Sequence, residues 1–238
     1  MGRPAYSTNC HQLSLNDYYT LLYYPEPLIA LLIAAHHKGL PNTPPPPLQL
    51  STPKPPAFTE KDNDLLRDTF SAHQLQNLLL ALLANSQRFY VSATVKLPKK
   101  TDPLRIVYAL LKLVPQPLRA FSWSTCRNGV FSPEQPHTLI CMSDTALSIR
   151  YDQLSATFPP SLQYLTRRLL EEPTVTQHAF VTLYGELPPQ LATYYAPIEF
   201  MADSTRDKSL MMWLIQQYLS VKLYRRVAKY ANQLDALT

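Results

Sequence analysis

Glycine is so scarce in this chain that a whole class of ligand-binding loops is excluded. Four glycines occur in 238 residues, namely Gly2, Gly39, Gly129 and Gly185. They stand far apart, so no phosphate loop of the G-x-x-x-x-G-K-S/T kind, no G-x-G-x-x-G dinucleotide turn and no G-x-S-x-G nucleophile elbow is present. A bound ligand would therefore be held by side chains on rigid elements and not by a glycine-rich backbone loop.

Proline is abundant instead, and its distribution divides the chain. Eleven of the 23 prolines precede residue 61. We expect a short helical N-terminal element over residues 1–40, built on the apolar run 28–35. A Pro-rich linker over 41–58 follows in extended polyproline conformation, either as a stiff spacer or as a ligand for an aromatic-lined groove. The remainder, residues 59–238, is predicted to be an α/β core domain.

The first part of the core domain predicts helices followed by a small sheet. Two capping boxes, beginning at Thr59 and Ser71, predict helices over about 60–69 and 72–84. Asp102 and Pro103 open a further helix with apolar residues at helical spacing. Strands are predicted from β-branched and aromatic runs at 88–95, 120–126 and 138–142. The order strand, helix, strand predicts a right-handed β-α-β crossover and a partly parallel sheet.

The last third is predicted to be mainly helical. Residues 160–171 have a helical pattern, 179–184 are interpreted as a strand, and 208–234 contain neither glycine nor proline. The last of these segments predicts one long C-terminal helix. The expected fold class is α/β to α+β, with a small partly parallel sheet, a β-α-β unit, flanking helices and a long C-terminal helix.

A resemblance to a known family lies in the middle of the chain. Residues 106–119 form a leucine-rich helix that ends in a Pro-x-x-Leu-Arg turn, and residues 120–125 read Ala-Phe-Ser-Trp-Ser-Thr. Together these segments resemble the middle module of bacterial GTPase-associated proteins of conflict systems, with Trp123 where Phe is usual. The resemblance covers residues 71–145. It implies a partner role beside nucleotide-switch or signalling ATPases, and it implies no catalytic residue.

Basic residues are concentrated in two segments of a chain whose net charge is +5. The patch at 96–105 carries Lys96, Lys99 and Lys100 between a predicted strand and a predicted helix N-terminus, where anions can bind. The patch at 222–229 comprises Lys222, Arg225, Arg226 and Lys229. Their spacing places all four on one face of a helix, with apolar residues opposite. Each patch is either a solvated surface or an anion-binding or nucleic-acid-binding site, and the patch at 222–229 could instead contact an acidic protein partner or an anionic membrane surface.

Catalytic and metal sites have little support in the residue pattern. Cys126 could be a thiol nucleophile with His137 as its base. The alternative is a buried, unreactive thiol. Adding Cys141 to this pair gives three potential metal ligands without paired spacing, so no metal and no cofactor are expected.

The function predicted from these features is a non-enzymatic interaction or regulatory module that binds a protein partner. The alternative is a nucleic-acid-binding protein that uses the two basic patches, and the second alternative is a cysteine-dependent hydrolase at Cys126. Three cysteines without a C-x-x-C pair fit a reducing compartment, so a cytoplasmic, bacterial protein is expected. No run of apolar residues approaches the ~20 that a membrane-spanning helix needs.

Overall fold

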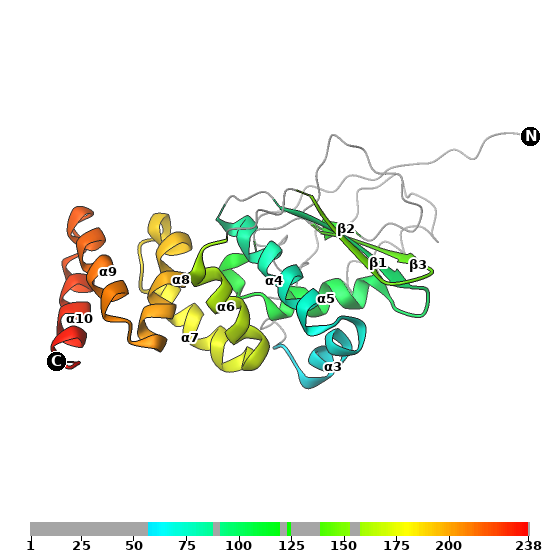
Figure 1. Ribbon diagram of the computed structural model, residues 1–238, viewed down its shortest axis with the longest axis horizontal. Helices are drawn as coiled ribbons and strands as arrows, with labels where there is room; N and C mark the ends of the chain where they lie inside the picture. Colours follow the sequence, from blue (N-terminus) through cyan, green and yellow to red (C-terminus); the bar gives the residue numbers. More distant parts are fainter. Residues whose placement is uncertain (1–56, 88–90, 120–122, 125–138, 153–157, 238) are drawn as a thin grey trace, which may run out of the picture. The chain divides into compact units, whose positions relative to one another are not determined.

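A computed structural model describes residues 57–87, 91–119, 123–124, 139–152 and 158–237 (Figure 1). The chain divides into two units, Met1–Ala57 and Phe58–Thr238, and the fold below is that of the second. The predicted N-terminal helix and nearly all of the predicted linker lie outside the described residues.

The two capping boxes at the start of the unit are confirmed. Helix α3 spans Glu60–Thr69 and α4 spans Ala72–Ser86, close to the predicted bounds. The Thr59 hydroxyl accepts from the backbone N–H of Asp62, whose carboxylate in turn accepts from the Thr59 backbone. Ser71 and Gln74 do the same at the start of α4. Each box therefore satisfies backbone donors that a helix N-terminus would otherwise leave free.

A four-stranded mixed sheet follows, in the order β2-β3-β1-β4. Its strands are β1 (Ser92–Pro98), β2 (Trp123–Ser124), β3 (Leu139–Asp144) and β4 (Ser148–Asp152). β3 pairs in parallel with both β1 and β2, whereas β4 runs antiparallel along β1. Helix α5 (Pro103–Leu113) connects β1 to β2, and a 3-10 turn over Gln116–Leu118 follows it. The predicted β-α-β unit and the partly parallel sheet are confirmed.

Strand β4 was not predicted. It is five residues long and follows β3 after the short connection 145–147, but it pairs with β1 and not with β3. The two strands therefore form no hairpin, and the connection contains no glycine or asparagine that would mark a turn. Apolar and polar residues do alternate along β4. Ile149 and Tyr151 pair with Val95 and Ala93 of β1, both of which are buried.

The sheet is buried on one face. Val95, Leu97 and Cys141 are fully buried there. Helix α4 contacts β1 and helix α5 contacts β3, so these two helices cover that face (Figure 1). The buried Lys112 of α5 forms an ion pair with Asp62 of α3 and joins these two helices.

The rest of the unit consists of helices. They are α6 (Pro160–Glu171), α7 (Pro173–Gly185), α8 (Pro189–Thr205), α9 (Lys208–Ser220) and α10 (Tyr224–Asp235). From α7 onward each packs on the helix before it, and α6 packs on α8 and on α4 beside the sheet (Figure 1). Three of the five begin with proline, a residue whose fixed φ and missing N–H suit the first helical position.

The strand predicted at 179–184 is wrong, because these residues lie within α7. Their β-branched and aromatic content favours a strand, but Thr176, Phe180 and Leu183 are buried together at helical spacing. Burial of this face against α6 and α8 therefore decides the local structure.

Pro197 lies inside α8 and leaves the carbonyl of Thr193 without its helical donor. The Gln87 side chain, at the C-cap of α4, donates to that carbonyl at 3.1 Å. The Gln87 side chain thus replaces the missing helical hydrogen bond, and α8 continues through the proline.

The stretch 208–234, predicted as one long helix, is helical, but a turn at 221–223 divides it into two helices, α9 and α10. Lys222 adopts a left-handed conformation with φ 60°, and the Leu223 N–H donates to the Tyr218 carbonyl. The turn lets α10 pack along α9 and brings Tyr218 and Tyr230 into stacking contact. Burial of these two tyrosines explains the turn, since no glycine or proline marks it. The predicted α+β class, with a small sheet and a helical C-terminus, is confirmed.

Candidate functional site

The first predicted site, the lysine-rich loop, lies where the sequence placed it. It leaves the carboxyl end of β1 and enters the N-terminus of α5. Lys96 pairs with Asp144 at 3.0 Å, and the carboxylate of Asp102 accepts from the Leu104 amide. One cation and one helix-terminal amide are thus already engaged. Lys99 and Lys100 remain exposed.

The second predicted site, the four-cation stripe on α10, is only half exposed. Lys222 and Arg225 are exposed, and Lys222 belongs to the turn before the helix. The side chains of Arg226 and Lys229 are only 11% and 26% exposed. The prediction of one solvent-facing row of four cations is therefore wrong for Arg226 and Lys229.

Arg226 and Lys229 are held by carboxylates of earlier helices. Glu199 of α8 is fully buried and lies 3.6 Å from Arg226 and 3.5 Å from Lys229. Lys229 also pairs with Asp203 at 2.7 Å, and Arg226 with Glu186 at 3.0 Å. We call these five side chains the charged cluster. It joins α10 to α8 and to the C-terminal end of α7.

Two buried tyrosines complete the surroundings of Glu199. The Tyr218 hydroxyl donates to Glu199, and the Tyr230 hydroxyl accepts from Lys229. Burial, and after it the negative charge of Glu199, raises the pKa of both tyrosines well above the ordinary value of 10. Both hydroxyls therefore stay protonated, and that of Tyr218 serves as a permanent donor to the carboxylate.

The sequence carries one signal of the cluster that could have been used. Glu199 stands in the otherwise apolar stretch 195–200 of α8, beside Ala196 and Phe200, which are both buried. A lone carboxylate on an apolar helix face needs a buried cation, because burial of an unpaired charge is very costly. Its cations are Arg226 and Lys229, which follow it by 27 and 30 residues. The sequence alone does not identify them, because their position depends on the turn at Lys222.

Four large apolar side chains of the same helical pair are exposed. Met212 and Leu219 on α9, Val221 in the turn and Tyr224 at the start of α10 are between 40% and 65% exposed. We call these four residues the apolar ridge. Met212 and Leu219 are seven residues apart and so lie on one face of α9. Lys222 and Arg225 stand beside the ridge in sequence and are exposed too.

Among the described residues, the structure contains no thiol or metal site that matches the candidates from the sequence. Cys126 and His137 lie outside the described residues, so the hydrolase interpretation stays a prediction. Cys141 is buried in β3, and this burial raises the pKa of its thiol to about 12. Within the described ranges, no group of three His, Cys, Asp or Glu side chains is placed to hold a metal ion.

None of the described helices combines the length and the apolar composition needed to cross a membrane. Comparisons of the chain with protein-family models, with curated proteins and with solved structures find no match.

Proposed function

We propose that this protein is a non-enzymatic interaction module that binds a protein partner through the α9–α10 helical pair. The single observation that carries the proposal is the apolar ridge, which leaves four large apolar side chains exposed in a segment that also carries the exposed cations Lys222 and Arg225. Protein-binding surfaces combine an apolar centre with a polar rim. The ridge provides the centre, and Lys222 and Arg225 provide a basic rim.

The basic rim favours a partner with an acidic surface. Arg226 and Lys229 are already occupied by Glu186, Glu199 and Asp203. Lys222 and Arg225 are engaged by no carboxylate of the described residues and are free to attract one. Charge at a rim mainly speeds association and selects partners. The partner would accordingly bind with an affinity that depends moderately on salt.

The identity of the partner remains the one that the resemblance of residues 71–145 implies, a nucleotide-switch or signalling ATPase of a bacterial conflict system. We place this role in the cytoplasm, because a few scattered cysteines suit a reducing compartment. A gene for such an ATPase beside the gene for this chain would support the assignment.

The experiment compares two exposed apolar sites by co-purification from the source cells. The test variant carries Met212→Ser and Leu219→Ser, and the control carries Val175→Ser, a still more exposed apolar residue on α7. Exposed positions tolerate such changes with little effect on stability. A partner that co-purifies in near-equal amount with the wild type and the control, but not with the test variant, supports the proposal. Equal recovery with both variants contradicts it.

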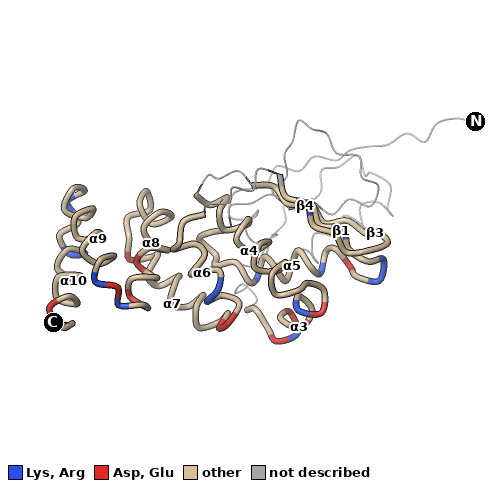
Figure 2. Tube along the Cα trace, in the orientation of Figure 1, with Lys and Arg blue, Asp and Glu red and all other residues tan. Residues whose placement is uncertain are grey.

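Nucleic-acid binding is the second candidate, and the exposed cations of the β1–α5 turn favour it. Lys99, Lys100 and Arg105 are exposed there. Figure 2 places this turn and α10 at opposite ends of the described unit, so the two basic patches do not form one continuous footprint. Binding that falls steeply with salt, and that is lost on Lys99→Glu with Lys100→Glu, would favour this candidate. Arg225→Glu is its matched control.

A further inference from the structure

The basic patch at 222–229 is divided between solvent and the interior of the fold. At about 100° per residue, Arg225, Lys229 and Arg226 lie within about 100° of one another around α10, so they share one helix face. Arg225 is exposed, as is Lys222 in the turn before the helix, whereas Arg226 and Lys229 are largely covered. The covering groups are the three carboxylates of the charged cluster, Glu186, Glu199 and Asp203. Carboxylates of the same chain therefore occupy the inner half of the basic patch.

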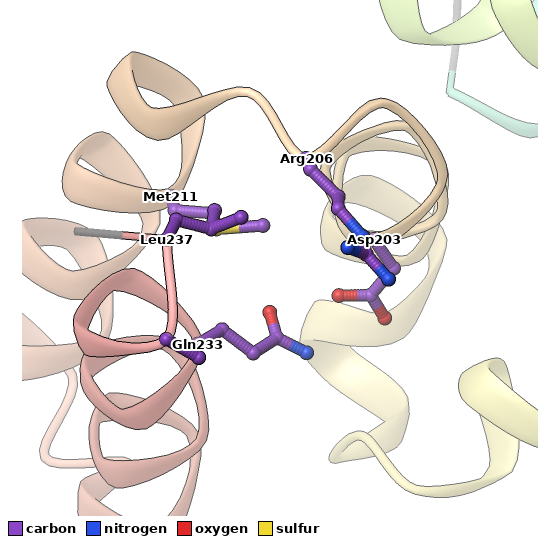
Figure 3. Close-up of a pocket in the computed structure, with 6 residues that line it drawn as sticks. Asp203, Arg206, Met211, Gln233 and Leu237 are labelled. Atoms are coloured by element: carbon purple, nitrogen blue, oxygen red, sulfur yellow. The ribbon is translucent and has the colours of Figure 1, made fainter.

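Close packing does not extend across the interface between α8 and the α9–α10 pair. α9 and α10 pack mainly on each other, and Figure 1 shows the pair at one end of the described unit, beyond α8. A cavity of about 270 Å³ lies between the two parts. Figure 3 shows Asp203 and Arg206 at the end of α8 across this space from Met211, Gln233 and Leu237 of the pair. Protein interiors contain few voids larger than a water molecule, so the charged cluster is a main attachment of the pair to α8.

Two buried oxygens at the same interface lack a hydrogen-bond donor within the part of the chain that the structure describes. They are Oδ1 of Asp203 on α8 and Oε1 of Gln233 on α10, and solvent does not reach either atom. A buried acceptor without a partner destabilises the arrangement that buries it. If the pair moved away from α8, water would hydrate both oxygens. The closed arrangement in the structure therefore carries a cost that an open arrangement lacks.

The connection between α8 and α9 is short and suited to act as a hinge. It consists of Arg206 and Asp207, between the end of α8 at Thr205 and the start of α9 at Lys208. Arg206 has φ 52°, a conformation outside either helix. The Asp207 carboxylate accepts from the Leu210 N–H, so α9 keeps its N-terminal cap when the pair moves. Hinges consist of a few residues at the ends of elements, and a rotation here would move α9 and α10 together.

We propose that the carboxylates of the charged cluster form an autoinhibitory contact, and that the α9–α10 pair turns away from α8 to offer all four cations of the basic patch at 222–229 to an acidic surface of the protein partner. This inference rests on the proposed function, because it adds regulation to the same helical pair. In the closed form the partner meets only Lys222 and Arg225 of the patch. In the open form Arg226 and Lys229 exchange their internal carboxylates for those of the partner. A partner that contacts four cations in one form and two in the other shifts the population toward the first.

The first test measures the affinity of the full chain for a defined acidic probe, a fluorescently labelled oligo-glutamate peptide. Glu186→Gln removes one internal carboxylate from Arg226, and because the Glu186 side chain is 55% exposed, the variant should fold as the wild type does. We expect it to bind the peptide at least about fivefold more tightly. Glu171→Gln, at an exposed acidic site on α6 outside the charged cluster, is the matched control and should bind as the wild type does. An unchanged affinity of Glu186→Gln overturns the proposal.

A double-mutant comparison separates the release of Arg226 from a simple relief of charge repulsion. In an Arg226→Gln background, Glu186→Gln should change the affinity for oligo-glutamate by less than about twofold, because Glu186 then has no cation to cover. An equal gain in both backgrounds would mean that Glu186 merely repels the probe, and this result overturns the autoinhibitory contact. A gain seen with oligothymidylate but not with oligo-glutamate would assign the released cations to nucleic acid and also overturns the proposal.

The second test follows the movement itself through Trp213 of α9, whose ring lies 6.3 Å from that of Tyr195 on α8. The chain has two tryptophans, so Trp123→Phe leaves Trp213 as the reporter. Saturating oligo-glutamate should shift the Trp213 emission to longer wavelength, because opening separates this ring from α8. An unchanged emission at saturation overturns the movement. Neither failure bears on the proposed function, whose own test changes Met212 and Leu219 and measures co-purification of the partner.

Discussion

The sheet half and the helical half of the described unit bury different kinds of side chain. From Phe58 to Asp152 the core is almost entirely aliphatic, with Phe58 and Phe70 as its buried aromatic residues among those described. From Phe158 onward it contains several buried phenylalanines and tyrosines, together with the fully buried carboxylate of Glu199. The core of the sheet half is thus mainly aliphatic, whereas that of the helical half is rich in aromatic residues and includes a charged group.

The difference shows how aromatic and charged burial depend on each other. A buried tyrosine carries a hydroxyl that needs a partner, whereas leucine and valine carry none. Tyr218 finds that partner in Glu199, which is buried because Arg226 and Lys229 neutralise it. The helical half therefore depends on a connected polar centre, whereas the buried charges described in the sheet half are the pair of Asp62 and Lys112 and Arg119, which donates to the Val114 carbonyl.

Removing the polar centre should have the largest effect on stability. Glu199→Ala leaves Arg226 and Lys229 without their shared buried carboxylate and Tyr218 without its acceptor. We expect the free energy of unfolding, measured with urea, to fall by about 3–5 kcal/mol. The control is Glu171→Ala, which breaks the exposed pair of Glu171 with Arg168 and should cost at most about 1 kcal/mol. Equal losses in the two variants would refute the role given to Glu199.

The ion pair of the sheet half should contribute less and should depend on pH. Burial acts to raise the pKa of Asp62, but hydrogen bonds from Lys112 and Thr59 outweigh it, so its pKa is lowered. Asp62→Asn keeps an oxygen for Thr59 and loses the charge that faces Lys112. We expect it to cost about 1.5–3 kcal/mol at pH 7.

The sign of that pH dependence follows from the lowered pKa of Asp62. A carboxyl with a lowered pKa in the folded state stabilises fully above its unfolded pKa of ~3.9, and it loses this contribution as the pH falls below that value. The stability difference between wild type and Asp62→Asn should therefore shrink between pH 7 and pH 3. The exposed Asp64→Asn variant serves as the control. A difference that stays constant down to pH 3 would contradict the account.

The turn that creates the α9–α10 pair offers a smaller, stabilising change. Lys222 has φ 60°, a conformation that costs energy for any residue with a Cβ atom. Lys222→Gly should raise the free energy of unfolding by about 0.5–1 kcal/mol. Ala228→Gly, at an exposed position within α10, should instead lower it by about 1 kcal/mol. Destabilisation by both glycines would mean that the chain does not turn at Lys222.

The exposed pair at the edge of the sheet half should matter least. Lys96 and Asp144 are 3.0 Å apart with side chains 46% and 34% exposed, so solvent screens their attraction. Lys96→Gln should leave the urea midpoint unchanged within error. A clear drop in the midpoint would mean that this half, too, depends on a polar contact.

Local signals were sufficient to predict most of the sheet half. The capping boxes at Thr59 and Ser71 and the proline after Asp102 act within one helical turn, so short sequence windows contain them. The β-α-β crossover followed because few connections join parallel strands. The sequence also placed the lysine-rich loop correctly at the carboxyl end of β1.

Contacts between distant segments were beyond that reasoning. The basic patch at 222–229 has the spacing of a solvent-facing row. Arg226 and Lys229 nevertheless form ion pairs with Glu186 and Glu199, which lie far upstream in the sequence. The turn at Lys222 carries no glycine or proline and exists because Tyr230 packs on Tyr218. These outcomes depend on which helices become neighbours in space, and no short window of sequence contains that information.

Amide hydrogen exchange on the purified complex tests the central claim most directly. The complex of the full chain with its co-purified partner is compared with the free chain, with exchange followed along the whole described unit. The account predicts slower exchange in the complex over residues 212–225 and unchanged exchange over 92–105. Protection of 92–105 with an unchanged α9–α10 pair would contradict it and would place the binding surface at the lysine-rich end of the sheet.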